Sequence, residues 1–256
     1  MKPSIWVYAL CYNEIHFIRN FFAAYKDADK ITIYDSNSTD GSTQVAEELG
    51  ATVIQIDTGD QLRDDIFIDI KNKCWKEARG KADWVIVCDL DEIFTRIVMT
   101  DGVVTYDLDL SVPFDGGFDV IKPYGYNMIG DAPSFTGDHP FIHSQNGARH
   151  PPAEKLCCFR PDRIAEINYS PGCHSANPVA VSGEVSVFYD RDYKALHYLG
   201  WNRESFVLKM ERGRGRLSDI NKQNGWGYQY LNTKEQNEGM FDFSLKNVVY
   251  LFDILP

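Results

Sequence analysis

The sequence has 256 residues, which is enough for one sizeable domain with a hydrophobic core. Its net charge of −11 argues against nucleic acid as a main partner, because phosphate backbones require a basic face. No apolar run is long enough to span a membrane, and residues 5–10 are expected to form a buried strand, not a signal peptide. The six cysteines include no Cys-x-x-Cys pair, which favours free thiols in a reduced, cytoplasmic protein.

The first ninety residues alternate apolar runs with segments in which apolar side chains recur at helical spacing. Helical periodicity is expected to begin near Ile15, Val45 and Ile66. Strands are expected at residues 5–11, 31–34, 51–56 and 84–88. Since such alternation produces parallel strands with right-handed crossovers, the sequence predicts an α/β fold with an open, mostly parallel sheet flanked by helices.

The pattern becomes less regular after residue 95. We expect a long loop at 131–152, short strands at 185–189 and 195–199, a helix at 203–212 and a mobile loop at 213–227. The apolar end, residues 243–255, is expected to dock on the core, with contact to a partner or a membrane surface as the alternative. We therefore predict one domain at 1–212, in which the pattern changes near residue 100, and an extension at 213–256.

Polar side chains follow the predicted strands where these end, and ligands of open α/β sheets bind at that edge. Tyr12-Asn13-Glu14 follows the first strand, Asp35-Ser36 the second and Asp89-Leu90-Asp91-Glu92 the fourth. Carboxylates in this position suit Mg²⁺ or Mn²⁺, which prefer hard oxygen ligands and leave places for phosphate oxygens. An acidic turn alone is also explained by solvated side chains, but successive polar strand ends favour a binding site.

Three ordered segments, at residues 8–14, 34–42 and 83–94, resemble the family 2-like glycosyltransferases of the GT-A fold. The most similar branch has a metal motif that reads Trp-x-x-x-x-Asp-x-Asp-Glu-Phe. Here Trp84 precedes Asp89 and Asp91 at this spacing, and Ile93 intervenes before the phenylalanine. The resemblance implies a single Rossmann-like domain that moves a sugar from a nucleoside diphosphate sugar, with UDP favoured, to a hydroxyl of a glycan or related acceptor. It also implies that residues 1–212 are the catalytic domain, with a nucleotide-binding half at 1–100 and an acceptor half at 101–212.

Weaker matches to the same branch occur at residues 154–162, 172–174 and 196–198. By this resemblance a histidine completes the metal site of Asp89 and Asp91; His197 is favoured, and His174 is the alternative. The residues expected to bind the nucleotide sugar are Tyr12, Asn13, Glu14, Asp35, Ser36, Arg63, Asp89, Leu90, Lys155, His174, Arg203 and Lys209.

The chemical step leaves two routes open. Asp91 is expected to act through its metal, which would stabilise the departing diphosphate. An inverting enzyme also needs a carboxylate base near the acceptor hydroxyl, for which Asp131, Asp138 and Glu154 are candidates by position. A retaining enzyme needs no such base.

Two other functions share parts of this pattern. A sugar nucleotidylyltransferase has a similar layout, but it is expected to carry a Gly-rich, basic loop where this chain has Tyr12-Asn13-Glu14. A non-catalytic glycan- or nucleotide-binding module would not require Asp89, Asp91 and His197 together. Turnover of a nucleotide sugar would separate both from a transferase.

Overall fold

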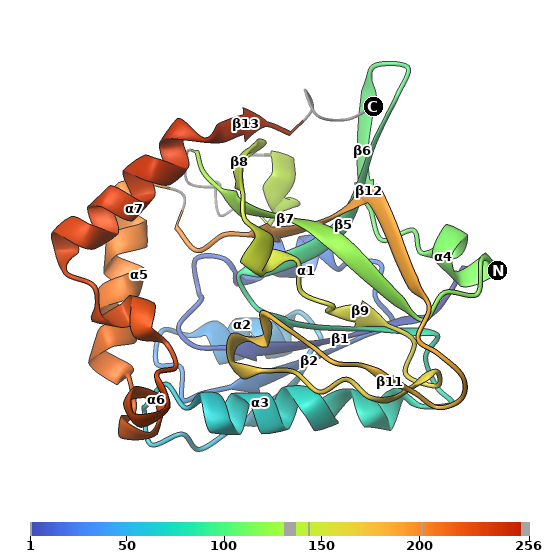
Figure 1. Cartoon of the computed structure of the whole chain (residues 1–256), viewed down its shortest axis with the longest axis horizontal. Coiled ribbons are helices and arrows are strands. Elements are labelled where there is room, and N and C mark those ends of the chain that lie inside the picture. Colours follow the sequence, from blue (N-terminus) through green and yellow to red (C-terminus); the bar gives the residue numbers. More distant parts are fainter. Residues whose placement is uncertain (1, 131–136, 143, 201, 252–256) are drawn as a thin grey trace.

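The computed structural model describes residues 2–130, 137–142, 144–200 and 202–251. In this part of the chain 11 strands form one sheet, and a second sheet has two strands. The main path runs β3-β2-β1-β4-β9-β7-β12-β5-β6, and β8 and β13 join it through β7. Helices flank this sheet (Figure 1), so the predicted α/β fold with an open sheet is confirmed.

The N-terminal quarter of the sheet is parallel throughout. Strands β1 (Ile5–Cys11), β2 (Lys30–Asp35), β3 (Thr52–Gln55) and β4 (Trp84–Asp89) pair in the order 3-2-1-4. They alternate with α1 (Ile18–Ala24), α2 (Ser42–Glu48) and α3 (Asp64–Lys73), and the short 3₁₀ helix η1 (Cys74–Ala78) continues α3. The predicted strands and helices of this region are confirmed to within a few residues.

The remaining strands are mixed in direction. They are β5 (Glu92–Thr100), β6 (Val103–Asp107), β7 (Val120–Met128), β8 (Asn146–Arg149), β9 (Cys158–Phe159), β10 (Ile164–Glu166), β11 (Val179–Ala180), β12 (Val187–His197) and β13 (Val248–Tyr250). Strand β12 runs parallel to β7 and antiparallel to β5. The two short strands expected at 185–189 and 195–199 therefore belong to one long strand.

The helical elements after β6 are mostly short. They are α4 (Ser111–Asp115), η2 (Pro140–Ile142), η3 (Pro151–Ala153), η4 (Pro171–Cys173), α5 (Arg203–Arg216), α6 (Asp219–Asn224), η5 (Tyr228–Leu231) and α7 (Lys234–Lys246). The expected loop at 131–152 thus contains η2 and β8, whereas residues 131–136 and 143 lie outside the described part.

The two faces of β1 belong to different cores, as alternation along a strand requires. Val7 and Ala9 pack with Phe21 of α1, whereas Tyr8 packs with Trp75 of η1 on the other face. A third cluster joins α5 to α7 through residues that include Phe206, Met210 and Phe241. Figure 1 shows α5, α6 and α7 gathered at one end of the sheet.

The prediction of a mobile loop at 213–227 is wrong for most of its length. Helix α5 continues to Arg216, and α6 follows with Ser218 as its N-cap. Tertiary packing overrides the low helix propensity of glycine here, because Gly213 lies directly against the ring of Tyr230. The expected boundary after residue 212 therefore falls inside a helix.

Of the apolar end predicted to dock at 243–255, residues 252–255 lie outside the described part. The described residues dock on the body, because Leu251 is buried and β13 pairs with β8. Phe243 of α7 is 69% exposed, so the docking face is only one side of that helix. Among the described residues, the helices are too short or too polar to cross a bilayer. All six cysteines are buried and unpaired.

Candidate active site

A pocket of about 1420 Å³ opens at the carboxyl ends of β1, β2 and β4. The register of the parallel strands places the predicted motifs side by side, because Leu10 pairs with Asp89 and Cys11 with Asp35. Two parts of the pocket lining differ in character. The ionic side consists of Glu14, Asp64, Asp89, Asp91, Glu92, Lys155, His197, Lys209, Arg212 and Arg216. The neutral wall consists of the pocket-lining residues between 225 and 247, from α6 to α7.

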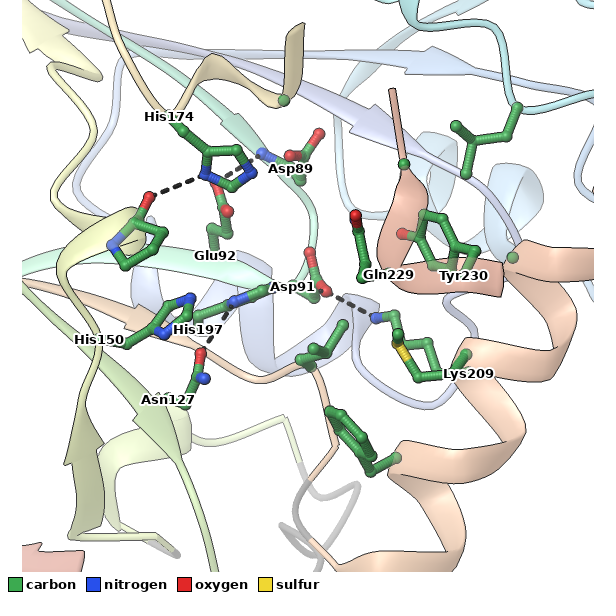
Figure 2. A pocket seen from close by; sticks show the side chains of 18 of the residues that line it. Asp89, Asp91, Glu92, Asn127, His150, His174, His197, Lys209, Gln229 and Tyr230 are labelled. Carbon is green, nitrogen blue, oxygen red and sulfur yellow. Dashed lines mark hydrogen bonds and ion pairs between the residues drawn. The ribbon is translucent and has the colours of Figure 1, made fainter. Parts of the chain in front are cut away.

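Asp91 lies at the centre of the ionic side (Figure 2). Its Oδ2 atom accepts a hydrogen bond from Nζ of Lys209 at 2.6 Å, and Nε2 of His197 lies 3.4 Å away. Burial opposes ionisation of Asp91, but the charge of Lys209 and the contact with His197 outweigh it and hold its pKa well below the ordinary value. The carboxyl group is therefore ionised at neutral pH.

Strand pairing explains why His197 reaches Asp91 across 106 positions of sequence. His197 pairs with Glu92 in the antiparallel contact of β12 and β5, and the backbone N–H of Tyr198 donates to the carbonyl of Asp91. The Nδ1 atom of His197 lies 3.2 Å from Oδ1 of Asn127. This second contact orients the ring so that Nε2 faces Asp91.

Asp89 is held differently from Asp91. Its carboxylate accepts a hydrogen bond from Lys71 at 2.7 Å and lies 3.5 Å from Nζ of Lys155. Burial raises the pKa of Asp89, but Lys71 and Lys155 together outweigh this effect and lower it. Lys155 also forms an ion pair with Glu92 at 2.6 Å. The first carboxylate of the motif is thus fixed by two nearly buried ammonium groups.

A second ion-pair group covers the segment after β1. Glu14 accepts from Lys209 at 3.1 Å and from Arg212 at 2.9 Å, and Arg212 also donates to the carbonyl of Asn13. Lys209 therefore bridges Glu14 and Asp91. Both cations come from the pocket-facing side of α5, so this helix supplies positive charge beside the strand ends.

The far end of the ionic side carries a cation–aromatic pair. The guanidinium of Arg216 lies 3.1 Å from the ring centroid of Tyr12 and donates to Ser36 Oγ at 3.1 Å. Beside it, Asp35 accepts from the backbone of Ser38, while its buried Oδ1 has no hydrogen-bond partner within the described residues. Asp35 is fully buried and does not itself line the pocket, whereas its neighbour Ser36 does.

Asp64 connects the ionic side to α6. The backbone N–H of Asp64 donates to Asn221, whose side-chain amide donates back to the Asp64 carboxylate at 2.9 Å. Burial, assisted by the charge of Asp89, raises the pKa of Asp64 to about 6. This carboxyl group titrates near neutral pH and has no lysine or arginine in direct contact among the described residues.

Two further histidines line the pocket. The ring centroid of His150 lies 6.5 Å from that of His197, and burial lowers the pKa of His150 to about 4. Nδ1 of His174 lies 3.0 Å from the carbonyl oxygen of Pro152, and burial likewise lowers its pKa. Figure 2 shows that His174 lies beside Asp89 and Glu92, whereas His197 lies beside Asp91. Both His150 and His174 are neutral at neutral pH.

The described residues do not form a complete metal cage, since no three His, Cys, Asp or Glu side chains converge on one point. Asp91 and His197 nevertheless present an oxygen and a nitrogen only 3.4 Å apart. A divalent cation that is shared with a diphosphate needs only one or two protein ligands, because phosphate oxygens and water fill the other positions. The pair therefore fits a metal that binds together with its substrate.

The predicted site residues fall into two groups. Those that line the pocket are Tyr12, Glu14, Ser36, Asp89, Leu90, Asp91, Lys155, His174, His197 and Lys209. Asn13 and Asp35 lie next to lining residues. Arg63 lies between the lining residues Leu62 and Asp64, but it does not itself line the pocket, and its guanidinium pairs with Asp65. Arg203 pairs with Asp242 on the outer side of α5 and α7.

Of the three predicted bases, Asp138 and Glu154 lie within the described residues, and neither lines the pocket. Asp138 is exposed, and its carbonyl accepts from Asn20 beside α1. The carboxylate of Glu154 is engaged by Arg149 and lies 3.9 Å from Lys122. Asp131 falls outside the described residues.

Several site residues were not predicted from the sequence. Lys71 was hidden in an amphipathic helix, although a lysine directly after Ile70 breaks the apolar face. Arg212 and Arg216 are spaced four apart on one helix face, a signal that the expected helix end at residue 212 obscured. Asn127, which positions His197, has no local signal.

Comparisons with known proteins give only distant similarity. No protein-family model and no curated protein matches the sequence. One similar solved structure is glucosyl-3-phosphoglycerate synthase from Mycobacterium tuberculosis in complex with Mn²⁺, UDP and glucosyl-3-phosphoglycerate; the match has 18% identity, covers 48% of this chain and 44% of that one, and has a TM-score of 0.30. A mycobacterial protein matches at 16% identity and a TM-score of 0.30, with 49% of this chain and 41% of that chain covered. The chain spans less than half the length of these structures, and similarity of this extent does not argue for a shared activity.

Proposed function

We propose that this protein is a metal-dependent glycosyltransferase of the GT-A type, which moves a sugar from a nucleoside diphosphate sugar to an acceptor hydroxyl. The observation that carries the proposal is Asp91, which lies at the carboxyl edge of the sheet between His197 and Lys209. The ordered motifs at the ends of β1, β2 and β4 support the same function. UDP is the first nucleotide to test, as the resemblance to the family 2-like branch favours it.

The residues of the ionic side have separable roles in this proposal. Asp91 and His197 would hold Mn²⁺ or Mg²⁺, and the metal would neutralise charge on the departing diphosphate. Lys209 and Arg212 lie beside the same space and can donate to phosphate oxygens. Asp89, fixed by Lys71 and Lys155, would act through the ribose or a water instead of binding the metal directly.

The nucleoside would lie towards Tyr12, Ser36 and Asp35. Ser36 offers a hydroxyl for the base or the ribose, and the Tyr12–Arg216 pair offers a planar surface. Asp35 is fully buried and would hold this segment through the hydrogen bond that it accepts from Ser38. A nucleotidylyltransferase is less well supported, because the segment after β1 carries Glu14 where that class would need backbone and cations for a triphosphate.

The test measures UDP binding by calorimetry with and without Mn²⁺. We expect binding that needs both components, and we expect Asp91→Asn to weaken it at least about 100-fold because it removes a charged metal ligand. Asp219→Asn, on a side chain that is 84% exposed, is the matched control and should bind as the wild type does.

Turnover then separates a transferase from a binding module. Release of UDP from UDP-sugars, compared with GDP- and dTDP-sugars, should depend on Mn²⁺ and on Asp91. Metal-independent nucleotide binding that survives Asp91→Asn would overturn the proposed role of this carboxylate. Absence of binding for every nucleotide would reject the function as a whole.

A further inference from the structure

The neutral wall differs from the rest of the pocket in its chemistry. Of the pocket-lining residues that the structure describes between 225 and 247, none carries a charge. The lining includes the aromatic side chains of Trp226, Tyr228, Tyr230 and Phe243. It also includes the carboxamides of Gln229, Asn232, Gln236 and Asn247. Asn232 donates to Met240, Gln236 accepts from the backbone of Thr233 and Asn247 donates to the carbonyl of Phe243, and each of these three keeps further donor or acceptor capacity. Flat apolar faces with neutral donors and acceptors between them match the surface of a sugar ring, which has apolar C–H faces and a rim of hydroxyls.

The absence of charge on this wall is not explained by the composition of the segment. Helix α7 carries Glu235, Glu238, Asp242 and Lys246, but these lie on faces other than the lining stripe. The stripe that lines the pocket recurs at helical spacing through Gln236, Met240, Phe243 and Asn247. The helix therefore presents its neutral side chains to the pocket and its ionic ones elsewhere.

The neutral wall also exposes large apolar side chains, and folding does not require their exposure. Tyr228 is 74% exposed, Phe243 69% and Met240 43%, although Phe241 on the same helix is buried against α5. Exposed aromatic groups that line a concave surface indicate a ligand.

The wall reaches the proposed reaction centre without a break. Figure 2 shows Gln229 and Tyr230 on the same side of the pocket as Lys209, facing Asp91. Tyr230 is fixed by Gly213 of α5, against which its ring packs, and its carbonyl accepts from Arg214. A ligand on the wall would therefore extend towards the donor site between Gln229 and Asp91.

We propose that the neutral wall is the acceptor site and that the acceptor is an uncharged saccharide, stacked on Tyr228 and Phe243 and hydrogen-bonded by the carboxamides. This inference rests on the proposed function and narrows it. A phosphorylated or carboxylated acceptor would find no cation on this wall. Arg149 lies close to the end of the wall, because its neighbour Ala148 pairs with Val248, but it is neutralised by Glu154 and packs on the ring of Tyr124.

The test compares two classes of small ligand by saturation-transfer NMR in the presence of UDP and Mg²⁺. The neutral class is cellotriose, maltotriose, mannotriose and chitotriose, and the anionic class is 3-phosphoglycerate and glucose 6-phosphate. We expect saturable binding of at least one trisaccharide and none of the anionic ligands. We expect Phe243→Ala to weaken that binding about tenfold through loss of a stacking face.

The matched control is Leu245→Ala, an exposed residue of the same helix that does not line the pocket. It should bind the trisaccharide as the wild type does, and both variants should keep the wild-type affinity for UDP with Mn²⁺. Since Phe243 is exposed, its replacement should leave the thermal midpoint nearly unchanged.

The outcomes separate this inference from the proposed function. Preference for an anionic ligand, failure of every trisaccharide, or equal binding by Phe243→Ala and wild type would overturn the acceptor assignment while UDP binding stands. Absence of UDP binding by the wild-type protein would instead reject the proposed transferase function. Trisaccharide binding that depends on Phe243 would support the wall as a saccharide site in either case.

Discussion

The ionic side and the neutral wall of the pocket differ in how their side chains are held before a ligand binds. On the ionic side, Glu14, Asp89, Asp91 and Glu92 each contact a cationic side chain, so charges are held in place before any ligand arrives. On the neutral wall, the aromatic groups of Tyr228 and Phe243 are left exposed. A ligand on the ionic side must replace existing partners, whereas a ligand stacked on these exposed aromatic groups displaces only water.

This difference predicts whether the side chains of each side contribute to the free energy of unfolding, to the free energy of ligand binding, or to both. The paired charges contribute to folding as well as to binding, because a buried charge without its partner is strongly destabilising. The exposed aromatics contribute little to folding, because they bury little area in the free protein. Substitutions of the ion-paired residues on the ionic side should therefore lower stability, and substitutions of the exposed aromatics on the wall should change ligand binding alone.

The largest effect is expected for Lys155→Met, which removes the cation between Asp89 and Glu92. The side chain of Glu92 is only 11% exposed, and Lys155 is its ion-pair partner at 2.6 Å. We expect the free energy of unfolding to fall by about 3–5 kcal/mol, measured by urea denaturation.

The matched control for this variant is Lys122→Met, because Lys122 is 44% exposed and lies 3.9 Å from Glu154. It should cost less than about 1 kcal/mol, as exposed pairs do. Equal losses of unfolding free energy in the two lysine variants would show that the ion pairs of the ionic side contribute no more than exposed pairs do.

A smaller, pH-dependent effect is expected at Asp64. Burial and the charge of Asp89 raise its pKa from 3.8 to about 6. Between these values the folded protein holds a proton that the unfolded chain has released, so this contribution to stability is lost as pH rises. Asp64→Asn stays neutral and keeps an oxygen that can accept from Asn221.

The stability of Asp64→Asn relative to wild type should therefore increase between about pH 4 and pH 7, by up to about 3 kcal/mol. Urea denaturation of both proteins at four pH values measures this difference. A difference that does not change with pH would show that the Asp64 carboxyl group titrates alike in the folded and unfolded states.

The parallel part of the fold could be predicted because its signals are local. Strands such as β1 and β4 are buried on both faces and appear as continuous apolar runs, and the register then aligns Asp35 and Asp89 beside β1. The predicted edge of the sheet was therefore the right place for the pocket, and most of the residues predicted there line it.

The rest of the fold and of the candidate site depends on contacts between segments that are distant in the sequence. The approach of His197 to Asp91 follows from the pairing of β12 with β5, and its orientation follows from Asn127 on β7. The contact of Arg216 with Tyr12 depends on how α5 crosses the strand ends. No periodicity within one segment encodes these contacts, and for the same reason Arg63 and Arg203 were predicted at a site that they do not reach.

The smallest effect on stability is expected where the two sides of the pocket meet. It can be measured by comparing substitutions at two glycines of α5. A Cβ atom on Gly213 would lie 2.3 Å from the ring of Tyr230, whereas a Cβ atom on Gly215 would meet nothing within 4 Å. Gly215→Ala should raise the free energy of unfolding by about 0.5–1 kcal/mol, since alanine favours the helix. Gly213→Ala gains the same helix propensity, but it must displace the ring and should lose about 1–2 kcal/mol net.

The same two variants test whether the packing of Tyr230 on α5 holds the neutral wall in position. If the ring fixes the wall, Gly213→Ala should weaken trisaccharide binding and leave UDP binding with Mn²⁺ intact, while Gly215→Ala changes neither. Denaturation and NMR titration on matched samples measure both properties. A Gly213→Ala protein that is as stable as Gly215→Ala would mean that Tyr230 moves freely and that the neutral wall is positioned by α7 alone.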